Sequence, residues 1–358
     1  MRAILSSKRS GIAVCLRGLG GVAIMGLMIG AISAPAAAES ISFRGKTIDM
    51  IVAYAAGGGT DLVGRLLAPY LTKFLPGNPA VVVQNMPGGS GSRAMNYIVQ
   101  RTVPDGLTVL MAAGSAVDPD LYRQLDAAYR PQDYRVVGGF GRGGMALMMR
   151  TAAAPRLLDR SQPPPVVAGV TAHDIFSRSG MALFGIEYLG WNGRWVVGYA
   201  GTNEIMLAMD RGEVDLAVDG TVSKIRGLVD SGQAHILALS ASRADFPDVP
   251  AFADLMKGKL KDPVDQKAFV YWHDYMEMDK WLGLAPSTPQ PIVAAYRTAF
   301  EQAASDPVFV EQGKKVSEDF VVQPAATVSQ LVNTLEGTPP EAIARIKQIA
   351  RKQGLNVQ

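Results

Sequence analysis

Short apolar runs alternate with amphipathic segments along most of the chain after residue 45. The first run, residues 48–52, is apolar at four of its five positions, which is typical of a strand buried on both faces. Similar runs predict further strands at residues 80–84, 107–113, 135–140, 145–150, 166–170, 194–199, 214–219, 235–240 and 279–285. The pattern therefore predicts a chain rich in buried strands.

The segments between these strands carry apolar residues three and four positions apart, as on one face of a helix. In residues 62–75 the apolar positions recur every four residues from Leu62 to Phe74, and we expect Pro69 to kink this helix or end its first half. Further helices are expected at residues 92–101, 119–128, 171–184, 202–211, 221–231, 289–304, 307–315, 324–335 and 339–353. Strands that alternate with helices imply right-handed crossovers and parallel sheets, so we predict an α/β fold.

Three glycines follow the first strand and lead into the first helix. They let a ligand approach backbone N–H groups, and Thr60 or Asp61 can N-cap the helix, whose free N–H groups and dipole attract anions. We therefore expect this loop to hold a small carboxylate, with a plain tight turn as the alternative. The predicted ligand-binding loop comprises Ala56, Gly57, Gly58, Gly59, Thr60 and Asp61.

Nucleotide-binding motifs do not fit this loop. A P-loop needs a lysine directly after its last glycine, and a dinucleotide fingerprint needs a glycine where Leu62 stands. Two further loops of small residues follow strands, at residues 87–92 and at Gly114 and Ser115. Because parallel strands end at the same edge of a sheet, we expect all three loops to lie on one edge.

The first 38 residues have the pattern of an export signal, with basic residues before an apolar stretch and the cleavage signal Ala36-Ala-Ala38. Removing them takes away four positive charges, which leaves 31 Lys and Arg against 32 Asp and Glu, a net charge of about −1. The mature chain has no cysteine, because Cys15 lies in the leader. We therefore expect a periplasmic protein without disulfides, and nothing in its charge suggests a nucleic-acid partner.

The length of the mature chain favours two domains, each large enough for its own core. We expect one lobe from residues 39–143 and 245–358 and the other from residues 144–244, each a mostly parallel sheet flanked by helices. No apolar run after the leader is long enough to span a bilayer.

The polar residues give no sign of a catalytic or metal site. The three histidines lack metal-ligand spacing, so we expect neither a metal nor a cofactor. A Gly-x-Ser-x-Gly elbow is missing, and Ser90 and Ser115 have no evident base. Two carboxylates have open roles: Asp61 could cap and fix its loop or contact the ligand, and Asp219 could accept from the ligand or cap the helix after it.

Six segments of the chain resemble, in the same order, the Bug or TctC family, the extracytoplasmic solute receptors of tripartite tricarboxylate transporters. They lie at residues 51–61, 81–91, 104–110, 212–219, 246–250 and 281–289. The resemblance implies a two-lobed fold of the type II periplasmic-binding-protein kind, with the ligand between the lobes. Residues 256–280 are longer and more aromatic than the family pattern, and they could cover the cleft or pack in the core.

The resemblance also implies ligand contacts. In the family, backbone N–H groups and waters of the Gly-Gly-Gly-Thr-Asp loop hold the carboxylate. Further contacts would come from Gly114, Ser115, Tyr199, Gly201 and Asp219. Thr171 would N-cap a helix of the second lobe, from whose first turn His173 could donate to the ligand.

We therefore predict a monomeric receptor without enzymatic activity that captures a small organic carboxylate in the periplasm. Its other partners would be the membrane permease subunits of a tripartite transporter. The alternatives are a periplasmic hydrolase or transferase on the same scaffold and a ligand-sensing subunit for a signalling partner.

Overall fold

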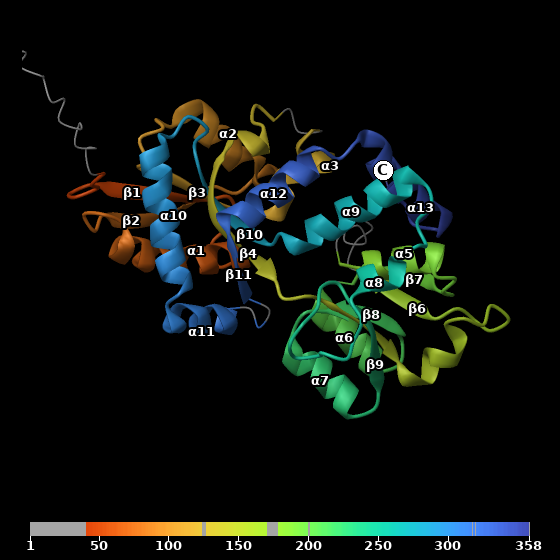
Figure 1. The fold of residues 1–358 in the computed structure, drawn as a ribbon. Coiled ribbons are helices and arrows are strands. Elements are labelled where there is room, and N and C mark those ends of the chain that lie inside the picture. The colour runs from red at the N-terminus through yellow and green to blue at the C-terminus, as the bar shows by residue number, and fades with distance from the viewer. Residues whose placement is uncertain are drawn as a thin grey trace, which may run out of the picture. The chain divides into compact units, whose positions relative to one another are not determined.

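The computed structural model describes residues 41–123, 127–169, 178–199, 201–316, 318 and 320–357. They form two mixed β-sheets flanked by helices, the two-lobed α/β fold that the sequence predicts (Figure 1). The first sheet has the strand order β11-β4-β10-β3-β1-β2. Its strands are β1 (Thr47–Val52), β2 (Ala80–Asn85), β3 (Thr108–Ala113), β4 (Arg135–Arg142), β10 (Lys280–Leu284) and β11 (Phe320–Pro324).

The first sheet is mixed, with four of its six strands, β1 to β4, running in one direction and β10 and β11 running against them, so the expectation of a mostly parallel sheet is confirmed. β1 pairs in parallel with β2 and β3, but β10 runs antiparallel between β3 and β4, and β11 runs antiparallel to β4. The reason is the path of the chain. It leaves the sheet at the end of β4, passes through the second sheet, and returns at Lys280, which lies opposite Ala113 and Phe140 near the ends of β3 and β4. Because β10 starts beside the carboxyl ends of β3 and β4, it must run antiparallel to both.

The second sheet has the order β7-β6-β8-β5-β9 and is also mixed. β6 pairs in parallel with β7 and β8, whereas β5 pairs antiparallel with β8 and β9. The strands are β5 (Ala146–Arg150), β6 (Val166–Gly169), β7 (Arg194–Val197), β8 (Leu216–Asp219) and β9 (Ala234–Leu239).

Each strand expected from the sequence is present, with ends within two residues of the predicted ones. β11 was not predicted, because its short apolar run ends in Pro324 and passes directly into a helix. Proline removes a ladder hydrogen bond and is tolerated at a sheet edge, which is where β11 lies.

The described helices include the predicted ones in the same order, together with α8 and α9, which were not predicted. α3 ends at Tyr122, so the expectation that this helix reaches residue 128 is wrong. They are α1 (Gly59–Phe74), α2 (Ser92–Arg101), α3 (Pro119–Tyr122), α5 (Gly180–Tyr188), α6 (Thr202–Asp210), α7 (Val222–Asp230), α8 (Phe252–Met256), α9 (Pro263–Glu277), α10 (Gln290–Ala304), α11 (Pro307–Val316), α12 (Ala325–Glu336) and α13 (Pro340–Lys352). Within the described ranges, none of the helices combines the length and the apolar composition needed to cross a bilayer.

α1 runs without interruption through Pro69, so the expectation that the helix ends there is wrong. Pro69 lies on the exposed side of the helix, where water can hydrogen-bond to the carbonyl that it leaves without a partner. The buried side carries Val63, Leu67 and Leu71, whereas Leu62 is exposed.

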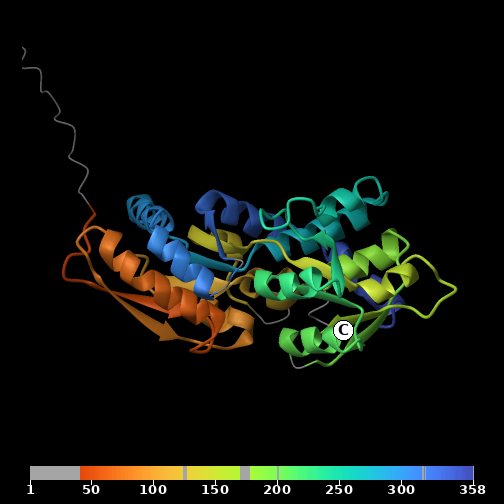
Figure 2. The same cartoon turned by 90° about the horizontal axis from the view of Figure 1, so that it is seen from below.

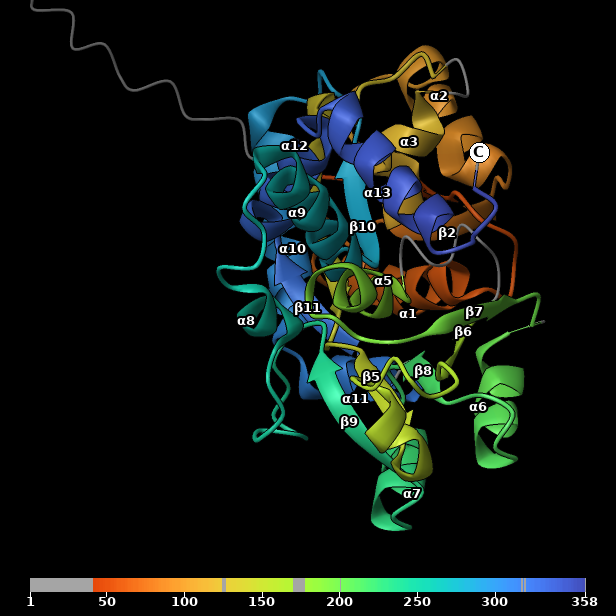
Figure 3. The same cartoon turned by 90° about the vertical axis from the view of Figure 1, so that its right-hand side faces the viewer.

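Helices cover both faces of the first sheet. α1, α10 and α11 pack together on one face over a core that includes Met50 and Val293 (Figure 2). α9, α12 and α13 lie side by side on the other face, over a core that includes Ile51 and Trp272 (Figure 3). This second core continues to Leu147 of β5, so the two sheets share one apolar cluster.

Candidate ligand-binding site

A cavity of about 390 Å³ lies between the two sheets. It opens at the start of α1, at the carboxyl ends of β3 and β8, and beside the first residues of β10 and α7. Open α/β sheets bind ligands at this edge. The described residues that line the cavity are Gly59, Thr60, Ala113, Met145, Arg178, Asp219, Gly220, Thr221, Asp279 and Lys280.

The glycine loop brings the start of α1 to this cavity. The helix begins at Gly59, with Gly58 as a residue that caps it without any side chain, so the expectation that Thr60 or Asp61 is the N-cap is wrong. Gly57 has a φ of +78°, in the left-handed region that glycine tolerates best. The helix therefore begins two or three residues earlier than expected, and its first residues, Gly59 and Thr60, lie on the cavity wall.

Asp61 fixes this loop through hydrogen bonds of its buried carboxylate. It is 1% exposed, and its Oδ2 accepts from the Gly57 N–H at 2.8 Å and from Arg65 Nε at 2.9 Å, while Oδ1 accepts from Asn85 Nδ2 at 2.8 Å. Burial alone would raise the pKa of Asp61, but the bonds from Arg65, Gly57 and Asn85 outweigh it and lower the pKa. Both carboxylate oxygens of Asp61 thus accept hydrogen bonds from other residues of the chain, and the Gly57 N–H donates to Asp61.

Lys280 places a cation beside the first turn of α1, a feature that sequence reasoning missed. A methyl group on Gly59 would lie 3.6 Å from Lys280 Cε and 3.9 Å from Nζ. Lys280 is 9% exposed, and its ammonium group is bonded to the carboxylate of Asp279. Lysine is rarely found at the first position of a fully buried strand, and that was the signal in the sequence.

The wall formed by the second sheet carries a buried carboxylate. Asp219 ends β8 and is 3% exposed, and its Oδ1 accepts from the Thr221 N–H at 2.7 Å, just before α7. Its Oδ2 is buried, lies 3.9 Å from Lys224 Nζ and accepts no hydrogen bond from the described residues. Asp219 therefore orders the turn into α7 from the wall of the cavity.

Arg178 adds a second cation to this wall and was also missed by sequence reasoning, which had looked only at the residues just before it. Its Nη1 lies 3.5 Å from Thr202 Oγ1 at the start of α6. Among the described lining residues, Arg178 and Lys280 balance the charges of Asp219 and Asp279. The starts of α1 and α7 add partial positive charge to the lining.

A smaller cavity of about 120 Å³ adjoins the first and shares Ala113 and Asp279 with it. The expected residues Gly114 and Ser115 line this smaller cavity. A Cβ on Gly114 would lie 2.6 Å from the Met278 carbonyl oxygen, so only glycine fits, and its N–H donates to the Asp279 carbonyl at 3.0 Å.

Ser115 is held by a neighbouring hydroxyl group. Its Oγ lies 2.6 Å from the hydroxyl of Tyr54, which donates to the Ser90 carbonyl at 2.8 Å. Burial raises the pKa of Tyr54, so this phenol stays protonated at neutral pH and is a poor base for activating Ser115.

The remaining predicted residues lie elsewhere. Ala56, Gly57 and Gly58 belong to the exposed part of the loop, away from the described lining. Tyr199 packs against the core of the second sheet, and Gly201 caps α6. Thr171 and His173 lie outside the described residues.

The aromatic segment forms α9 and packs mainly in the core. Tyr271 and Trp272 are buried, and the Tyr271 hydroxyl donates to Asp118 Oδ1 at 2.7 Å. Tyr275 is the aromatic residue of this helix that lines the smaller cavity. The segment therefore contributes packing more than a cover for the cleft. Over the described part of the chain, no cluster of His, Cys, Asp and Glu has the geometry of a metal site.

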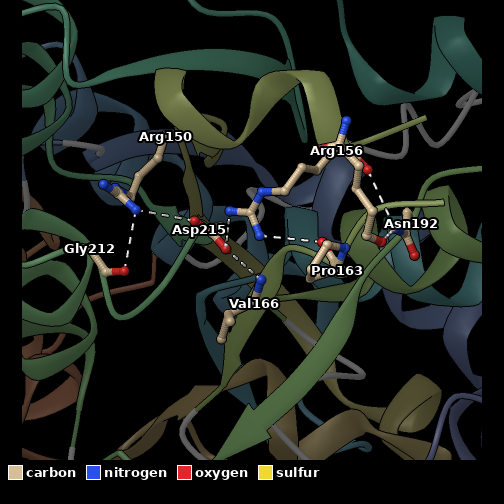
Figure 4. Close-up of polar contacts among 8 residues, drawn as sticks. Arg150, Arg156, Pro163, Val166, Asn192, Gly212 and Asp215 are labelled. Carbon is tan, nitrogen blue, oxygen red and sulfur yellow. Dashed lines mark hydrogen bonds and ion pairs between the residues drawn. The ribbon is translucent and has the colours of Figure 1, made fainter. Parts of the chain in front are cut away.

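An ion cluster anchors the other end of β8 (Figure 4). Asp215 directly precedes the strand, and its carboxylate binds Arg150 Nη1 at 3.2 Å, Arg156 Nη2 at 3.0 Å and the Val166 N–H at 2.9 Å. The cluster ties β5, β6 and β8 together at the edge opposite Asp219. It thus fixes the strand that presents Asp219 to the cavity.

Comparison with known proteins places this arrangement in a family. No family model matches the chain. The chain is 28% identical, over 306 residues, to the UPF0065 protein in the TAR-I ttuE-ttuC' intergenic region of Agrobacterium vitis, a match that covers 81% of this chain and 80% of that one. It is 34% identical to BugT of Bordetella pertussis over 95 residues, 26% of this chain and 28% of BugT.

The fold agrees with these matches. A ligand-free TctC solute-binding protein from Polaromonas superposes with a TM-score of 0.66 at 17% identity, over 87% of this chain and 100% of the other. The relatives and this structure support the Bug/TctC family for the chain. A second solved structure with this fold, an R. palustris protein with adipate, gives a TM-score of 0.53 at 19% identity, over 86% of this chain and 97% of the other. Solute-binding proteins thus share the fold.

Proposed function

We propose that this Bug/TctC protein is a periplasmic receptor that captures a small organic carboxylate in the 390 Å³ cavity and delivers it to a membrane permease. One observation carries the proposal: the buried Lys280 ammonium group lies against the first turn of α1. A carboxylate there would meet backbone N–H donors, the positive end of a helix dipole and the ammonium group of Lys280, which is paired with Asp279. Charge-assisted bonds of this kind are the stronger ones in proteins.

The size of the cavity supports the same ligand class. Small-molecule sites commonly measure about 300–1,000 Å³, and this cavity lies near the lower limit. Adipate, a small dicarboxylate, is bound in one of the solved structures that share the fold.

Closure of the two lobes over the ligand would complete the site. In this proposal residues 39–143 and 245–358 form one lobe and residues 144–244 form the other. The start of α7 lines the cavity from the second lobe, so it would reach the ligand only together with α1. A ligand that touches both helix starts would shift the equilibrium towards the closed form.

The experiment is a thermal-shift screen of the mature protein against carboxylic acids and their amides, followed by calorimetry. An acid that binds should raise the melting temperature in a concentration-dependent way, and its uncharged amide should not. Binding by amides or neutral sugars without binding by any acid would refute the assignment. Recovery of the bound acid without chemical change would separate the receptor from a periplasmic hydrolase or transferase.

The cellular location and the oligomeric state are part of the same proposal. The export signal predicts a mature protein that starts at Glu39 in the periplasmic fraction, which mass spectrometry of that fraction can test. We propose a monomer, because a receptor must present the cleft of a single chain to the permease. Light scattering with and without ligand tests the oligomeric state. If the protein serves signalling instead of transport, a strain that lacks it should retain uptake of the ligand.

A further inference from the structure

The two connections between the sheets touch each other beside the cavity. The first connection, residues 143–145, leads from β4 to β5, and the second begins at Ser240, directly after β9. The Met145 N–H donates to Ser240 Oγ at 2.8 Å, and the Ser240 N–H donates to the Met145 carbonyl at 2.8 Å. Gly144 allows this close approach, because it has a φ of +88° and a Cβ there would collide with the Ala241 carbonyl oxygen. The two connections therefore form one tightly packed junction.

Arg243 adds a buried cation to this junction. Its side chain is 3% exposed, and its Nη1 donates to the Gly144 carbonyl at 2.8 Å and to the Gly220 carbonyl at 2.7 Å. Its acidic partner Asp245 lies 3.2 Å from Nη2 and is itself 46% exposed. A buried charge is costly unless it is well hydrogen-bonded. The shortest bonds of this guanidinium group go to the backbone, and they join the first connection to the loop that holds Gly220.

Gly220 belongs to the cavity wall. It lies between the end of β8 and the start of α7, and the peptide group that joins it to Thr221 is fixed on both sides. Arg243 binds the carbonyl of this peptide group, and Asp219 Oδ1 accepts from its N–H at 2.7 Å. A peptide group that is held at both ends resists rotation. Arg243 therefore sets the orientation in which α7 begins.

We propose that Arg243 is a positioning residue of the binding site, which ties the cavity wall at the start of α7 to the junction of the two connections. This rests on the proposed function, in which the start of α7 meets the ligand. Arg243 touches no ligand in this role and acts through the Gly220 peptide group. Because the chain crosses between the sheets at this junction, the wall would follow any movement of the two connections.

Hydrogen exchange of the ligand-free protein tests the positioning directly. Arg243→Met removes the guanidinium donors and keeps an apolar stem, so the Gly220 carbonyl loses its partner. We expect peptides that cover residues 219–223 to exchange about tenfold or more faster than in the wild type. The matched control is Arg297→Met, because Arg297 also binds a backbone carbonyl, that of Val136, through Nε and Nη2. The control should leave exchange at residues 219–223 unchanged.

Calorimetry with succinate, malate and adipate tests the effect on binding. Arg243→Met should bind about tenfold or more weakly, since a wall that adopts its binding conformation a tenth of the time lowers the apparent affinity by the same factor. Arg243→Lys keeps the charge and a donor, so it should recover part of the lost affinity. Arg297→Met should lose stability but bind as the wild type does.

A measurement on the wild-type protein keeps the test decisive if Arg243→Met folds poorly. In native-state hydrogen exchange with rising urea, the N–H groups of Met145 and Thr221 should become accessible together, because the same junction holds both. Opening of Thr221 at lower urea than Met145 would overturn the inference.

Failure of the inference differs from failure of the proposed function. Unchanged exchange at residues 219–223 in Arg243→Met, or wild-type affinity of that variant, would overturn the role of Arg243 and leave the carboxylate receptor standing. If no carboxylic acid binds to the wild-type protein, the proposed function falls, and the role of Arg243 in binding falls with it.

Discussion

Glu318, close to the edge strand of the first sheet, binds Ser223 in the first turn of α7 beside the second sheet. Glu318 Oε2 accepts from the Ser223 N–H at 3.0 Å, and Oε1 accepts from Ser223 Oγ at 2.9 Å. The two bonds from Ser223 lower the pKa of Glu318. A carboxylate close to the first sheet thus binds the start of the helix that lines the cavity beside the second sheet.

We predict that Glu318→Gln weakens this link in a pH-dependent way. Because the pKa of Glu318 is lower in the folded state, its stabilisation is fully present above the unfolded value of about 4.3 and is lost as the pH falls through the folded value. At pH 7 the variant should be less stable by under about 1 kcal/mol, since the pair is exposed. Urea unfolding from pH 7 to pH 3 checks this: the gap between variant and wild type should shrink as the pH falls, and a constant gap would contradict it.

Gly59→Ala should reduce affinity without reducing stability. The new methyl group would make ordinary contacts at 3.6 Å and 3.9 Å with Lys280, so no strain is expected. Alanine favours a helix over glycine by about 0.5–1 kcal/mol, so the melting temperature should hold or rise. The methyl group fills the space beside the first N–H groups of α1, and we expect the dissociation constant to rise at least about tenfold.

The matched control for this variant is Gly227→Ala, a glycine within α7 whose added methyl group would touch nothing within 4 Å. It should leave affinity unchanged. Carboxylate binding by Gly59→Ala that equals the wild type would show that the glycine loop is only a tight turn.

Removal of the Lys280 cation should weaken carboxylate binding about 10- to 100-fold, the range of a charge-assisted hydrogen bond. Lys280→Met is combined with Asp279→Asn, so that the pair is neutralised together and no bare charge remains. The control is Lys315→Met with Glu311→Gln, which removes an exposed pair on α11. Calorimetry should show a large loss for the first pair alone, and similar losses for both would indicate a non-specific charge effect.

Local sequence patterns predict the elements of this fold well and their pairing poorly. The apolar runs locate the inner strands because strands buried on both faces carry apolar residues at nearly every position. β2 and β7 have apolar runs as well, although they are edge strands and only partly buried. The antiparallel insertion of β10 between β3 and β4 depends on where the returning chain enters the sheet. No local pattern contains that information.

The same limit explains which site residues could be predicted. Gly59, Thr60 and Asp219 follow from glycines and polar residues at the ends of strands, and they line the cavity. Lys280 stands more than 200 residues from the glycine loop, and its role follows only from the position of β10. The role of Asp61 was half predicted: it does fix the loop, but it binds the Gly57 N–H outside the helix and so does not cap it.

The two aspartates at the ends of β8 should separate stability from binding. Asp215→Ala removes the buried acceptor shared by Arg150, Arg156 and the Val166 N–H, so we expect a loss of about 2–4 kcal/mol, below the full value for a buried pair because both arginines are about a quarter exposed. The folded fraction should bind its ligand within about twofold of the wild type, since Asp215 lies at the edge of the sheet opposite the cavity. Asp219→Asn should show the reverse, with altered affinity and a smaller change in stability. Urea unfolding and calorimetry on both variants decide this, and a loss of affinity in the folded fraction of Asp215→Ala would contradict the division of roles along the strand.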